Sequence, residues 1–344
     1  MSLVSRLAET RPAGASRLRL PALGFGTAPL GEHTVKIEEA DARATLDAAW
    51  EAGVRYFDTA PWYGRGLAEH RLGTFLRNKP RGDFIVSTKV GRTLRRPADP
   101  TQFDRSPWVG GLNFEVEFDY TYDGIMRSYE QALQRLSLDR VDALVIHDLD
   151  RMYHGRSLPE FEAQLTGSGI RALEELKRHG DILAYGMGIN EDESLETTAA
   201  LVDLDFCLVA LPYTLIDQDV LETGMAALHK RGVSVIVGSP FASGILATGT
   251  NGPGRYRYAP PPPKIAEKVR DIESVCRKHG IPLPAAALQF VLAHPNVIST
   301  IPGSVSSDEV RQNVAFVDLP ISPAFWSDLK SQGLIAQASP VPSP

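Results

Sequence analysis

Four polar residues stand at the ends of short apolar runs in this sequence. Asp58 ends RYFD, Lys89 ends FIVSTK, His147 ends VDALVIH and Asn190 ends ILAYGMGIN. A single histidine or lysine in such a place is more often a buried structural residue than a catalytic one. If the runs are parallel strands, however, their carboxyl ends all meet at one face of the fold. Four polar strand ends together therefore indicate a site that combines a carboxylate, an ammonium group, an imidazole and an amide.

Tyr63 adds an acid–base group to this set. It lies five residues beyond Asp58, in the turn-rich segment DTAPWYGRG. A free tyrosine has a pKa of about 10, too high for proton transfer at neutral pH, but a neighbouring cation favours the phenolate. We expect Lys89, held by Asp58, to be that cation. The alternative is that Tyr63 is an aromatic lid residue packed beside Trp62.

The runs that carry these residues alternate with amphipathic segments along the chain. The runs are almost continuously apolar, which is typical of strands buried on both faces of a parallel sheet. The segments between them place apolar residues three and four positions apart, which is typical of helices. The predicted strands are 21–27, 55–58, 84–89, 141–147, 182–190, 205–211, 233–239 and 297–303, and the predicted helices are 38–53, 122–136, 169–179, 192–202, 217–231, 264–279 and 306–317.

This regular alternation, without a linker, predicts an α/β protein with a (β/α)8 TIM barrel. The alternative is a doubly wound sheet, whose first helix usually opens with a G-x-G-x-x-G fingerprint. The segment GFGTAPLG at 24–31 has three glycines but not that spacing. We therefore expect one barrel domain over residues 1–344, with its core at about 17–320 and a mobile C-terminal tail that ends in QASPVPSP.

Two long segments inside the predicted core interrupt the alternation. Residues 91–122 are polar and aromatic, and residues 242–263 contain glycines and the run Pro260–Pro263. Loops of this length in a compact domain are usually functional or disordered. Because loops that follow barrel strands stand over the active-site face, we expect both segments there.

The composition argues against several kinds of partner. Hydrophobic residues make up 43% and charged residues 23% of the chain, which is typical of a globular protein. There are 36 Lys and Arg against 42 Asp and Glu, a net charge of −6 without a basic stripe, so nucleic acid is not an expected partner. No stretch approaches the roughly 18 uninterrupted apolar residues of a membrane helix. We expect no membrane partner.

The cysteine content and the N-terminal sequence are further evidence on the kind of protein and its location. Cys207 and Cys276 are too few for a disulfide framework or a four-cysteine zinc site, and no metal site is expected. The first residues, MSLVSRLAETRPAGASR, have no apolar segment of the kind found in signal peptides. The chain is therefore expected to be cytoplasmic and to act on a small molecule. It carries no signal for its oligomeric state.

Several motifs, in order along the chain, resemble those of the aldo-keto reductases. They are GFGT, DTAxxYG, the strand-ending Lys89 and His147, SPFASGIL at 239–246 and IPGSVSSDEVRQN at 301–313. The resemblance implies an NAD(P)-dependent oxidoreductase acting on CH–OH groups, with the same barrel and a nicotinamide dinucleotide bound without a Rossmann fold. It also implies a catalytic tetrad of Asp58, Tyr63, Lys89 and His147. In this tetrad Tyr63 takes or gives the proton, Lys89 and Asp58 tune it, and His147 orients the substrate oxygen.

The same resemblance implies a set of cofactor contacts. Gly26 and Thr27 match the loop near the nicotinamide ribose, and Asn190 matches the residue that holds the carboxamide. The whole predicted cofactor set is Gly26, Thr27, Asp58, Asn190, Ser239, Phe241, Ser243, Gly244, Leu246, Gly303, Ser304, Glu309, Gln312 and Asn313. The backbone N–H groups of 239–246 suit the pyrophosphate. Three neighbours of the nicotinamide depart from the family pattern, with Ile189, Ala210 and Gly238 in place of the usual serine, glutamine and aromatic residue.

The last motif also departs from the family in its charges. Members that prefer NADP have a lysine after the Ile-Pro pair and an arginine six residues further on, where this chain has Gly303 and Glu309. The cations for a 2′-phosphate are therefore missing. A carboxylate can instead accept a hydrogen bond from the free ribose 2′-hydroxyl of NAD. We expect NAD as the cofactor and NADP less, the alternative being that Arg311 replaces the lost cation.

The long segment 91–122 resembles the branch of the family that contains L-fucose (D-threo-aldose) 1-dehydrogenases and pyridoxal 4-dehydrogenases. Both substrates are cyclic hemiacetals and both products are lactones. The resemblance thus implies NAD-dependent oxidation of an L-fucose-type aldose at its anomeric carbon, with Tyr63 as general base. The alternatives are pyridoxal, giving 4-pyridoxolactone, and, in another class, a regulatory subunit that uses bound cofactor as a redox sensor.

Aromatic residues near the predicted site suit either substrate. Trp62, Trp108, Tyr120 and Tyr122 offer ring faces that stack on the C–H face of a sugar or on a pyridine ring. The predicted substrate contacts are Trp62, Tyr63, Trp108 and His147.

Overall fold

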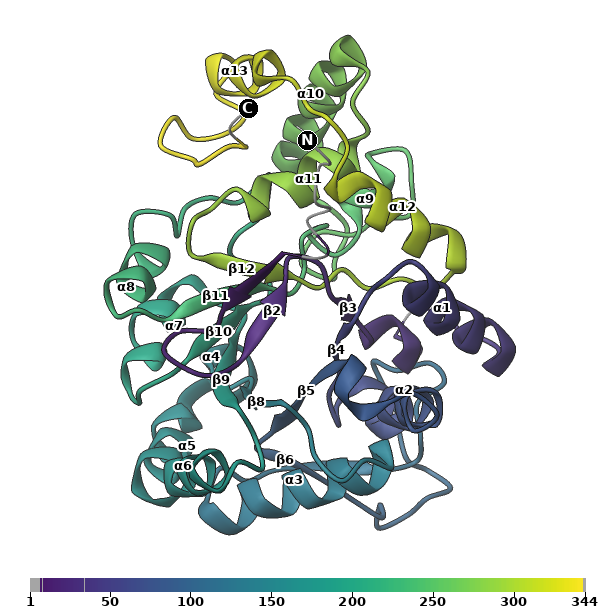
Figure 1. The fold of residues 1–344 in the computed structure, drawn as a ribbon, viewed down its shortest axis with the longest axis vertical. Coiled ribbons are helices and arrows are strands. Elements are labelled where there is room, and N and C mark those ends of the chain that lie inside the picture. The colour runs from purple at the N-terminus through teal and green to yellow at the C-terminus, as the bar shows by residue number, and fades with distance from the viewer. Residues whose placement is uncertain (1–6, 8, 34, 343–344) are drawn as a thin grey trace.

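The computed structural model of the chain describes residues 7, 9–33 and 35–342, and its centre is one sheet of eight parallel strands. The two edges of the sheet meet, because Leu23 bridges to Thr300 and Gly26 bridges to Gly303. This closure makes the predicted (β/α)8 barrel, with strands in the middle and helices around them (Figure 1). In sheet order the strands are β12 (Val297–Thr300), β11 (Ser234–Val237), β10 (Phe206–Val209), β9 (Ala184–Ile189), β8 (Ala143–His147), β5 (Ile85–Val90), β4 (Tyr56–Asp58) and β3 (Phe25–Gly26).

The helices form the outer layer of the barrel. None of those in the described part of the chain combines the length and apolar character needed to cross a membrane. The longer helices are α1 (Glu39–Glu51), α2 (Leu67–Leu76), α3 (Tyr122–Leu136), α6 (Ile170–His179), α8 (Gly224–Lys230), α10 (Pro263–His279), α11 (Leu283–Leu292), α12 (Ser307–Val317) and α13 (Pro323–Ser331). The short ones are α4 (Arg151–His154), α5 (Leu158–Gln164), α7 (Asp192–Glu196) and α9 (Ile245–Thr248).

The apolar core has two layers. One lies between strands and helices, and the other fills the barrel interior with side chains such as Tyr56, Phe206 and Ile236. A hairpin of β1 (Thr10–Pro12) and β2 (Arg19–Pro21) contributes Leu18 and Leu20 to the interior layer. Its Gly14 N donates to Ser234 Oγ at 2.9 Å, at the start of β11. The hairpin therefore closes the amino-terminal end of the barrel and leaves the other end for a site.

The structure confirms all eight predicted strands but changes some helices. The predicted helix 217–231 begins only at Gly224, because residues 214–218 form a local turn in which Gln218 Nε2 donates to the carbonyls of Thr214 and Leu215. Two of the longer helices inside the predicted core, α2 and α11, are absent from the sequence prediction. The helix α11 is buried on nearly all sides, so it lacks an amphipathic period. The helix α2 buries the charged residues Glu69 and Arg71, which break the apolar pattern.

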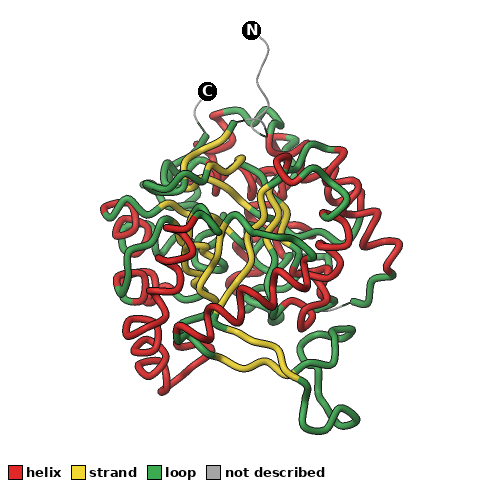
Figure 2. Tube along the Cα trace, turned by 60° about the horizontal axis from the view of Figure 1, so that its bottom comes forward, coloured by secondary structure: helices red, strands yellow, loops and turns green. Residues whose placement is uncertain are grey.

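The segment 91–122 forms a hairpin beyond the barrel. Its strands are β6 (Arg92–Arg95) and β7 (Glu115–Phe118), which pair antiparallel and stand out below the barrel in Figure 2, with a long loop at their end. The hairpin directly follows β5, whose end carries Lys89. It therefore stands on the face where the polar strand ends meet, as the sequence predicts.

The C-terminal segment differs from the mobile tail that the sequence predicts. Residues after Pro320 form α13, which packs against α10, and Phe325 and Trp326 are buried. Beyond this helix, Gln337 Nε2 donates to Lys330 O at 2.7 Å, and Ser339 is buried. The predicted tail contains the apolar pair Phe325 and Trp326, whose burial holds the helix on the barrel. Residues 343–344 lie outside the described residues.

The packing of α13 leads to a prediction about stability. We expect Trp326→Ala to lower the free energy of unfolding by about 3–5 kcal/mol, because a large buried side chain leaves a cavity. Leu201→Ala, at a residue that is 36% exposed, is the control and should cost less than about 1 kcal/mol. Urea unfolding measures both. A Trp326→Ala loss as small as that of the control would show that the tail is loosely held.

Candidate active site

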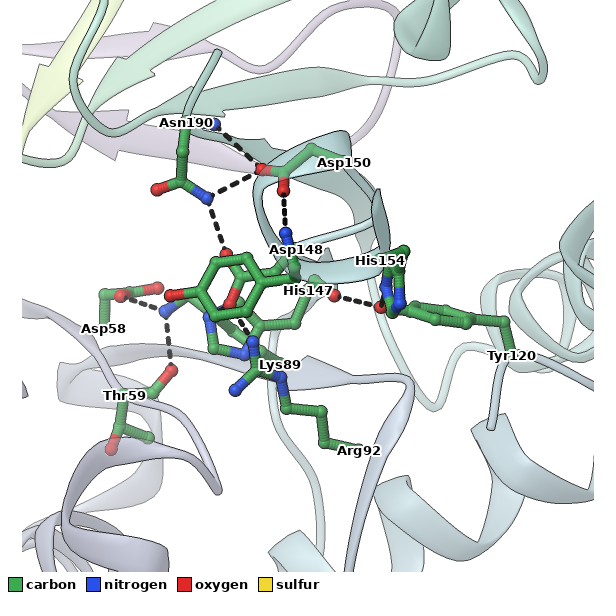
Figure 3. Close-up of polar contacts among 11 residues, drawn as sticks. Asp58, Thr59, Lys89, Arg92, Tyr120, His147, Asp148, Asp150, His154 and Asn190 are labelled. Carbon is green, nitrogen blue, oxygen red and sulfur yellow. Dashed lines mark hydrogen bonds and ion pairs between the residues drawn. The ribbon is translucent and has the colours of Figure 1, made fainter. Parts of the chain in front are cut away.

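The polar strand ends gather at the carboxyl-terminal end of the barrel. Asp58 is the last residue of β4, Lys89 lies near the end of β5 and His147 is the last residue of β8. Asn190 directly follows β9. Because all these strands are parallel neighbours, their side chains converge, as Figure 3 shows.

Lys89 and Asp58 form a buried ion pair. Lys89 Nζ lies 2.5 Å from Asp58 Oδ2 and also donates to Thr59 O at 2.8 Å. The second carboxylate oxygen of Asp58 accepts a hydrogen bond from Ser87 Oγ at 2.7 Å. Both charged side chains are at most 2% exposed. Charges this deeply buried persist only when they are paired and hydrogen-bonded, and both conditions are met here.

Tyr63 lies between this ion pair and His147. Lys89 Nζ is 4.7 Å from the centre of the Tyr63 ring, and the Tyr63 and His147 rings are 6.1 Å apart and perpendicular. Burial raises the pKa of Tyr63 well above its ordinary value, and Asp58 raises it further, whereas Arg92 opposes the shift. The sequence argument expected Lys89 to favour the phenolate. Because burial penalises the phenolate most and the Asp58 carboxylate adds to that effect, the phenol is instead held protonated in this structure.

His147 is held as a neutral imidazole. Burial, followed by the charges of Arg92 and Lys89, lowers the pKa of His147 well below its ordinary value. Its backbone is fixed as well, since Tyr120 donates from its hydroxyl to the His147 carbonyl at 2.6 Å. Among the described residues, Nδ1 of His147 is a buried ring nitrogen without a hydrogen-bond partner. The imidazole thus keeps unused hydrogen-bonding capacity inside the site.

A second group of buried charges, which sequence reasoning missed, lies behind His147. Arg92 at the start of β6 pairs with Asp148, and Asn190 Nδ2 donates to Asp148 Oδ1 at 2.7 Å and to Asp150 Oδ2 at 2.9 Å. Figure 3 shows Asp148 between Arg92 and Asn190. The signal in the sequence was the run HDLD, which places two carboxylates directly after the strand-ending histidine.

The loop at the end of the β6–β7 hairpin forms one wall of the site. The Trp108 ring, 4% exposed, lies 5.7 Å from the Trp62 ring and 6.0 Å from the Tyr63 ring. Arg65 holds this loop, because its guanidinium donates to the carbonyls of Ser106 at 3.1 Å and Phe114 at 3.0 Å. The structure thus brings the predicted substrate contacts Trp62, Tyr63, Trp108 and His147 together.

Tyr120 and Tyr122 do not belong to this wall. Tyr120 is fully buried, and besides its bond to the His147 carbonyl it contacts His154 Nε2 at 3.0 Å. Tyr122, at the start of α3, donates from its hydroxyl to Glu175 Oε2 at 2.7 Å. Both rings are thus committed to internal contacts, so the stacking role considered for them is wrong.

Of the residues predicted for the cofactor, Thr27 is suited to a dinucleotide. Thr27 Oγ1 is buried and has no hydrogen-bond partner among the described residues, so it can accept a ligand group. After β11, Ala242, Ser243 and Gly244 have successive positive φ angles of 49°, 64° and 107°. The N–H groups of Ala242 and Gly244 donate to the carbonyls of Ser239 and Phe241 at 3.0 and 2.9 Å, and the N–H of Ser243 donates to Ser239 Oγ at 3.4 Å, so these groups are used inside the turn and are not offered to a phosphate. Thr27 is therefore the feature here that suits a dinucleotide. Ser239, Phe241 and Leu246 lie on the same loop, where Leu246 is part of the core.

The remaining predicted contacts lie where β12 leads into α12. Ser304 is buried and accepts a hydrogen bond from Asn313 Nδ2 at 3.1 Å, whereas Gln312 is exposed. Glu309 belongs to a capping box, since its N–H donates to Ser306 Oγ and its Oε2 accepts from Val305 N at 2.8 Å. Its side chain nevertheless stays exposed at this surface.

Gly26 and Gly303, where the two edges of the sheet meet, lie too close to neighbouring atoms to carry a side chain. A Cβ atom on Gly26 would lie 2.6 Å from the Ile301 carbonyl oxygen, and one on Gly303 would lie 2.5 Å from Pro29 Cγ. A lysine at 303 therefore does not fit unless Pro29 moves. Arg311, considered as a replacement cation, is paired with Asp308 at 3.0 Å.

Comparisons with known proteins agree with this geometry. The sequence model of the Aldo/keto reductase family matches residues 22–333. The chain is 40% identical over 340 residues to a pyridoxal 4-dehydrogenase of Microbacterium luteolum, covering 96% of this chain and 99% of that protein. It is 36% identical over 334 residues to a D-threo-aldose 1-dehydrogenase of a Pseudomonas species, with the same coverage. The solved holo structure of aldo-keto reductase AKR11C1 from Bacillus halodurans, 27% identical, superposes with a TM-score of 0.69 over 95% of this chain and 96% of that chain.

The buried ion pair supports a prediction about folding. We expect Lys89→Met to lower the free energy of unfolding by about 3–5 kcal/mol, because it leaves the Asp58 carboxylate buried without its cation. The double variant Asp58→Asn/Lys89→Met removes both charges and should recover part of that loss. Urea unfolding of the two variants and the wild type measures the difference. If the double variant is no more stable than the single one, the pair does not act as a coupled unit.

Proposed function

Because the chain belongs to the Aldo/keto reductase family of nicotinamide-dependent oxidoreductases, we propose that it oxidises the hydroxyl of a cyclic hemiacetal to a lactone with NAD. The observation that carries the proposal is the group formed by the Lys89–Asp58 pair, Tyr63 and His147 at the open end of the barrel. Relatives named for pyridoxal and for D-threo-aldose support an alcohol-type substrate of small size. They favour an enzyme over the regulatory-subunit alternative.

We propose that Tyr63 receives the hydroxyl proton of the hemiacetal. When bound, the oxidised nicotinamide supplies a positive charge and the acceptor for the hydrogen that leaves the anomeric carbon with its electron pair. Tyr63 must itself be deprotonated to act as the base, and Lys89 and Arg92 are the cations of the chain near its ring. His147, neutral and buried, orients the substrate by a hydrogen bond.

The aromatic rings beside Tyr63 favour a substrate with one flat apolar face and with polar groups elsewhere. The indole rings of Trp62 and Trp108 are perpendicular to one another and border Tyr63. Indole faces bind the C–H face of a sugar and also a pyridine ring. An L-fucose-type aldose is our first candidate, because it presents such a C–H face beside its hydroxyl groups. Pyridoxal is the second candidate, favoured by the 40% identity to a pyridoxal 4-dehydrogenase.

A substrate panel tests the proposal. L-Fucose, D-arabinose, L-galactose, D-glucose and pyridoxal are each supplied with NAD and with NADP, and reduced cofactor is followed by absorbance. We expect NAD-linked turnover of at least one hemiacetal, with its lactone identified as product. Higher catalytic efficiency on pyridoxal than on every sugar would replace the aldose assignment. No turnover of any of the five would contradict hemiacetal oxidation.

Tyr63→Phe tests the base directly. We expect kcat to fall by about 10²–10⁴, the usual contribution of a positioned acid–base group, while the Kd for NAD changes by no more than a few-fold. Steady-state kinetics and fluorescence titration of the cofactor measure the two quantities. Activity of the Phe variant within a few-fold of the wild type would identify Tyr63 as a lid residue.

The raised pKa of Tyr63 predicts the pH dependence of oxidation. A group with a raised pKa is deprotonated only at alkaline pH, so kcat/KM for oxidation should rise with pH, by up to roughly tenfold per pH unit below the pKa. The profile of the wild type is measured from neutral to alkaline pH, with protein stability checked at each value. A rate that falls as the pH rises would argue against Tyr63 as the proton acceptor.

The charge of Glu309 predicts cofactor choice. We expect the wild type to prefer NAD by at least about tenfold in kcat/KM, which corresponds to about 1.4 kcal/mol, because a carboxylate repels a 2′-phosphate. Glu309→Gln keeps an oxygen for the Val305 N–H but removes the charge, so it should narrow the preference without loss of stability. Glu267→Gln, an equal charge change on α10, is the control. Equal use of NADP by the wild type would contradict the prediction.

A further inference from the structure

Tyr258 stands at the tip of a tight turn in the long segment that follows β11. Tyr256 and Ala259 exchange backbone hydrogen bonds at 2.9 and 3.0 Å, so Arg257 and Tyr258 are the two central residues of this turn. Their φ angles are 48° and 64°. Such a turn favours glycine and asparagine, because a side chain strains the backbone at positive φ. Two large side chains at these positions indicate that the side chains themselves have a use there.

Hydrogen bonds on both sides hold the turn in place. Tyr258 N donates to Ser243 Oγ at 3.2 Å, and Arg255 Nη1 donates to the Tyr258 carbonyl at 3.3 Å. The Tyr256 hydroxyl donates to Asp217 Oδ1 at 2.6 Å. None of these contacts uses the side chain of Tyr258. The ring is therefore presented from a backbone that is fixed without it.

The Tyr258 side chain reaches across the open end of the barrel. Its ring centre lies 5.6 Å from that of His33, which lies between β3 and α1. Burial raises the pKa of Tyr258, Asp148 after β8 adds to this shift, and Lys89 of β5 opposes it. In the order of the sheet, β8 and β5 are three and four strands away from β11. A side chain from the segment after β11 comes close to both only if it extends over the mouth of the barrel.

Tyr258 remains accessible although its hydroxyl is surrounded by protein. The residue is 52% exposed, yet burial is the main cause of its raised pKa. An accessible ring whose hydroxyl lies deep within the protein borders a recess rather than an outer surface. The raised pKa also keeps the phenol protonated at neutral pH, so the hydroxyl can donate as well as accept a hydrogen bond.

Tyr258 ends a series of aromatic contacts that begins at Tyr63. The ring centres of Tyr63 and Trp108 are 6.0 Å apart, those of Trp108 and His33 are 5.1 Å apart, and those of His33 and Tyr258 are 5.6 Å apart. Trp108 is 4% exposed, so it supports the series from within, whereas the other three rings are at least partly accessible. Tyr258 also raises the pKa of Tyr63, after burial and Asp58. The two phenols therefore border the same space.

We propose that Tyr258 is a substrate-contact residue that closes the site from the side of β11 and donates its hydroxyl to a polar group of the substrate. The inference rests on the proposed function, because it concerns the same site, and it adds a residue that determines specificity. An aldose has further hydroxyl groups that can meet Tyr258 when its anomeric hydroxyl is at Tyr63. Proton transfer stays with Tyr63, so Tyr258 contributes to binding.

Removal of the hydroxyl tests the contact. On the substrate found in the panel, Tyr258→Phe should raise KM by about 3–10-fold, the effect of losing one hydrogen bond, with kcat within a few-fold of the wild type. Tyr258→Ala removes the ring as well and should raise KM further. The Kd for NAD, measured by fluorescence titration, should change by no more than a few-fold in both variants, because the turn is held by other groups.

Tyr122→Phe is the matched control. It also removes a tyrosine hydroxyl that donates a hydrogen bond, but the acceptor is Glu175, away from the catalytic face. We expect its KM and kcat to match those of the wild type. Urea unfolding of the Tyr258 variants checks that the fold is kept, as expected for a residue that is 52% exposed.

The outcomes separate this inference from the proposed function. If the wild type turns over a panel compound and Tyr258→Phe has the same KM, the inference is wrong and the proposed function stands. A fall in kcat at unchanged KM would also overturn the inference, because it would place Tyr258 in the chemical step. No turnover of any panel compound would contradict both.

Discussion

The contact between Lys89 and Asp58 is the constraint on which the rest of the site depends. An ammonium group and a carboxylate that are both almost fully buried are stable only at close range and with their remaining hydrogen-bonding capacity used. The parallel register of β4 on β5 sets Asp58 opposite Ser87, which donates to it, and brings Lys89 within reach of the other oxygen. Tyr63 is placed over the lysine as a consequence.

A second buried ion pair, Arg92–Asp148, lies beside β8, the next strand of the sheet after β5. Arg92 and Asp148 are buried beside His147, so two cations and two carboxylates lie close together with little water to screen them. Burial is the main reason that Tyr63 and His147 both stay neutral, and the nearby charges add to it, Asp58 for Tyr63 and Arg92 and Lys89 for His147. A site of this kind changes its proton affinity strongly when a further charge enters, because the interaction of charges in a poorly solvated region is strong. Binding of a charged cofactor is such an event.

The β6–β7 hairpin contributes both to this charge network and to the aromatic wall beside Tyr63. Arg92 is the first residue of β6, and the loop at the end of the hairpin carries Trp108 onto Tyr63. Arg65 fixes that loop by donating to its backbone carbonyls. The central carbon of its guanidinium also lies 5.1 Å from the centre of the Trp62 ring. One hairpin therefore supplies both an aromatic ring beside Tyr63 and a cation that acts on His147.

The sequence by itself determined the barrel, its eight strands and the position of Asp58, Lys89 and His147 at strand ends, whereas the tetrad with Tyr63 was implied by the family resemblance. Those features depend on local patterns, since apolar runs that end in polar residues place the polar ends on one face of any parallel barrel. Only the tertiary structure decided the partners of those residues. Arg92 and Asp148 are 56 positions apart, and nothing in either neighbourhood shows that they meet. The protonation of Tyr63 was also decided by packing, because its raised pKa comes first from burial of the ring and then from the nearby Asp58 carboxylate.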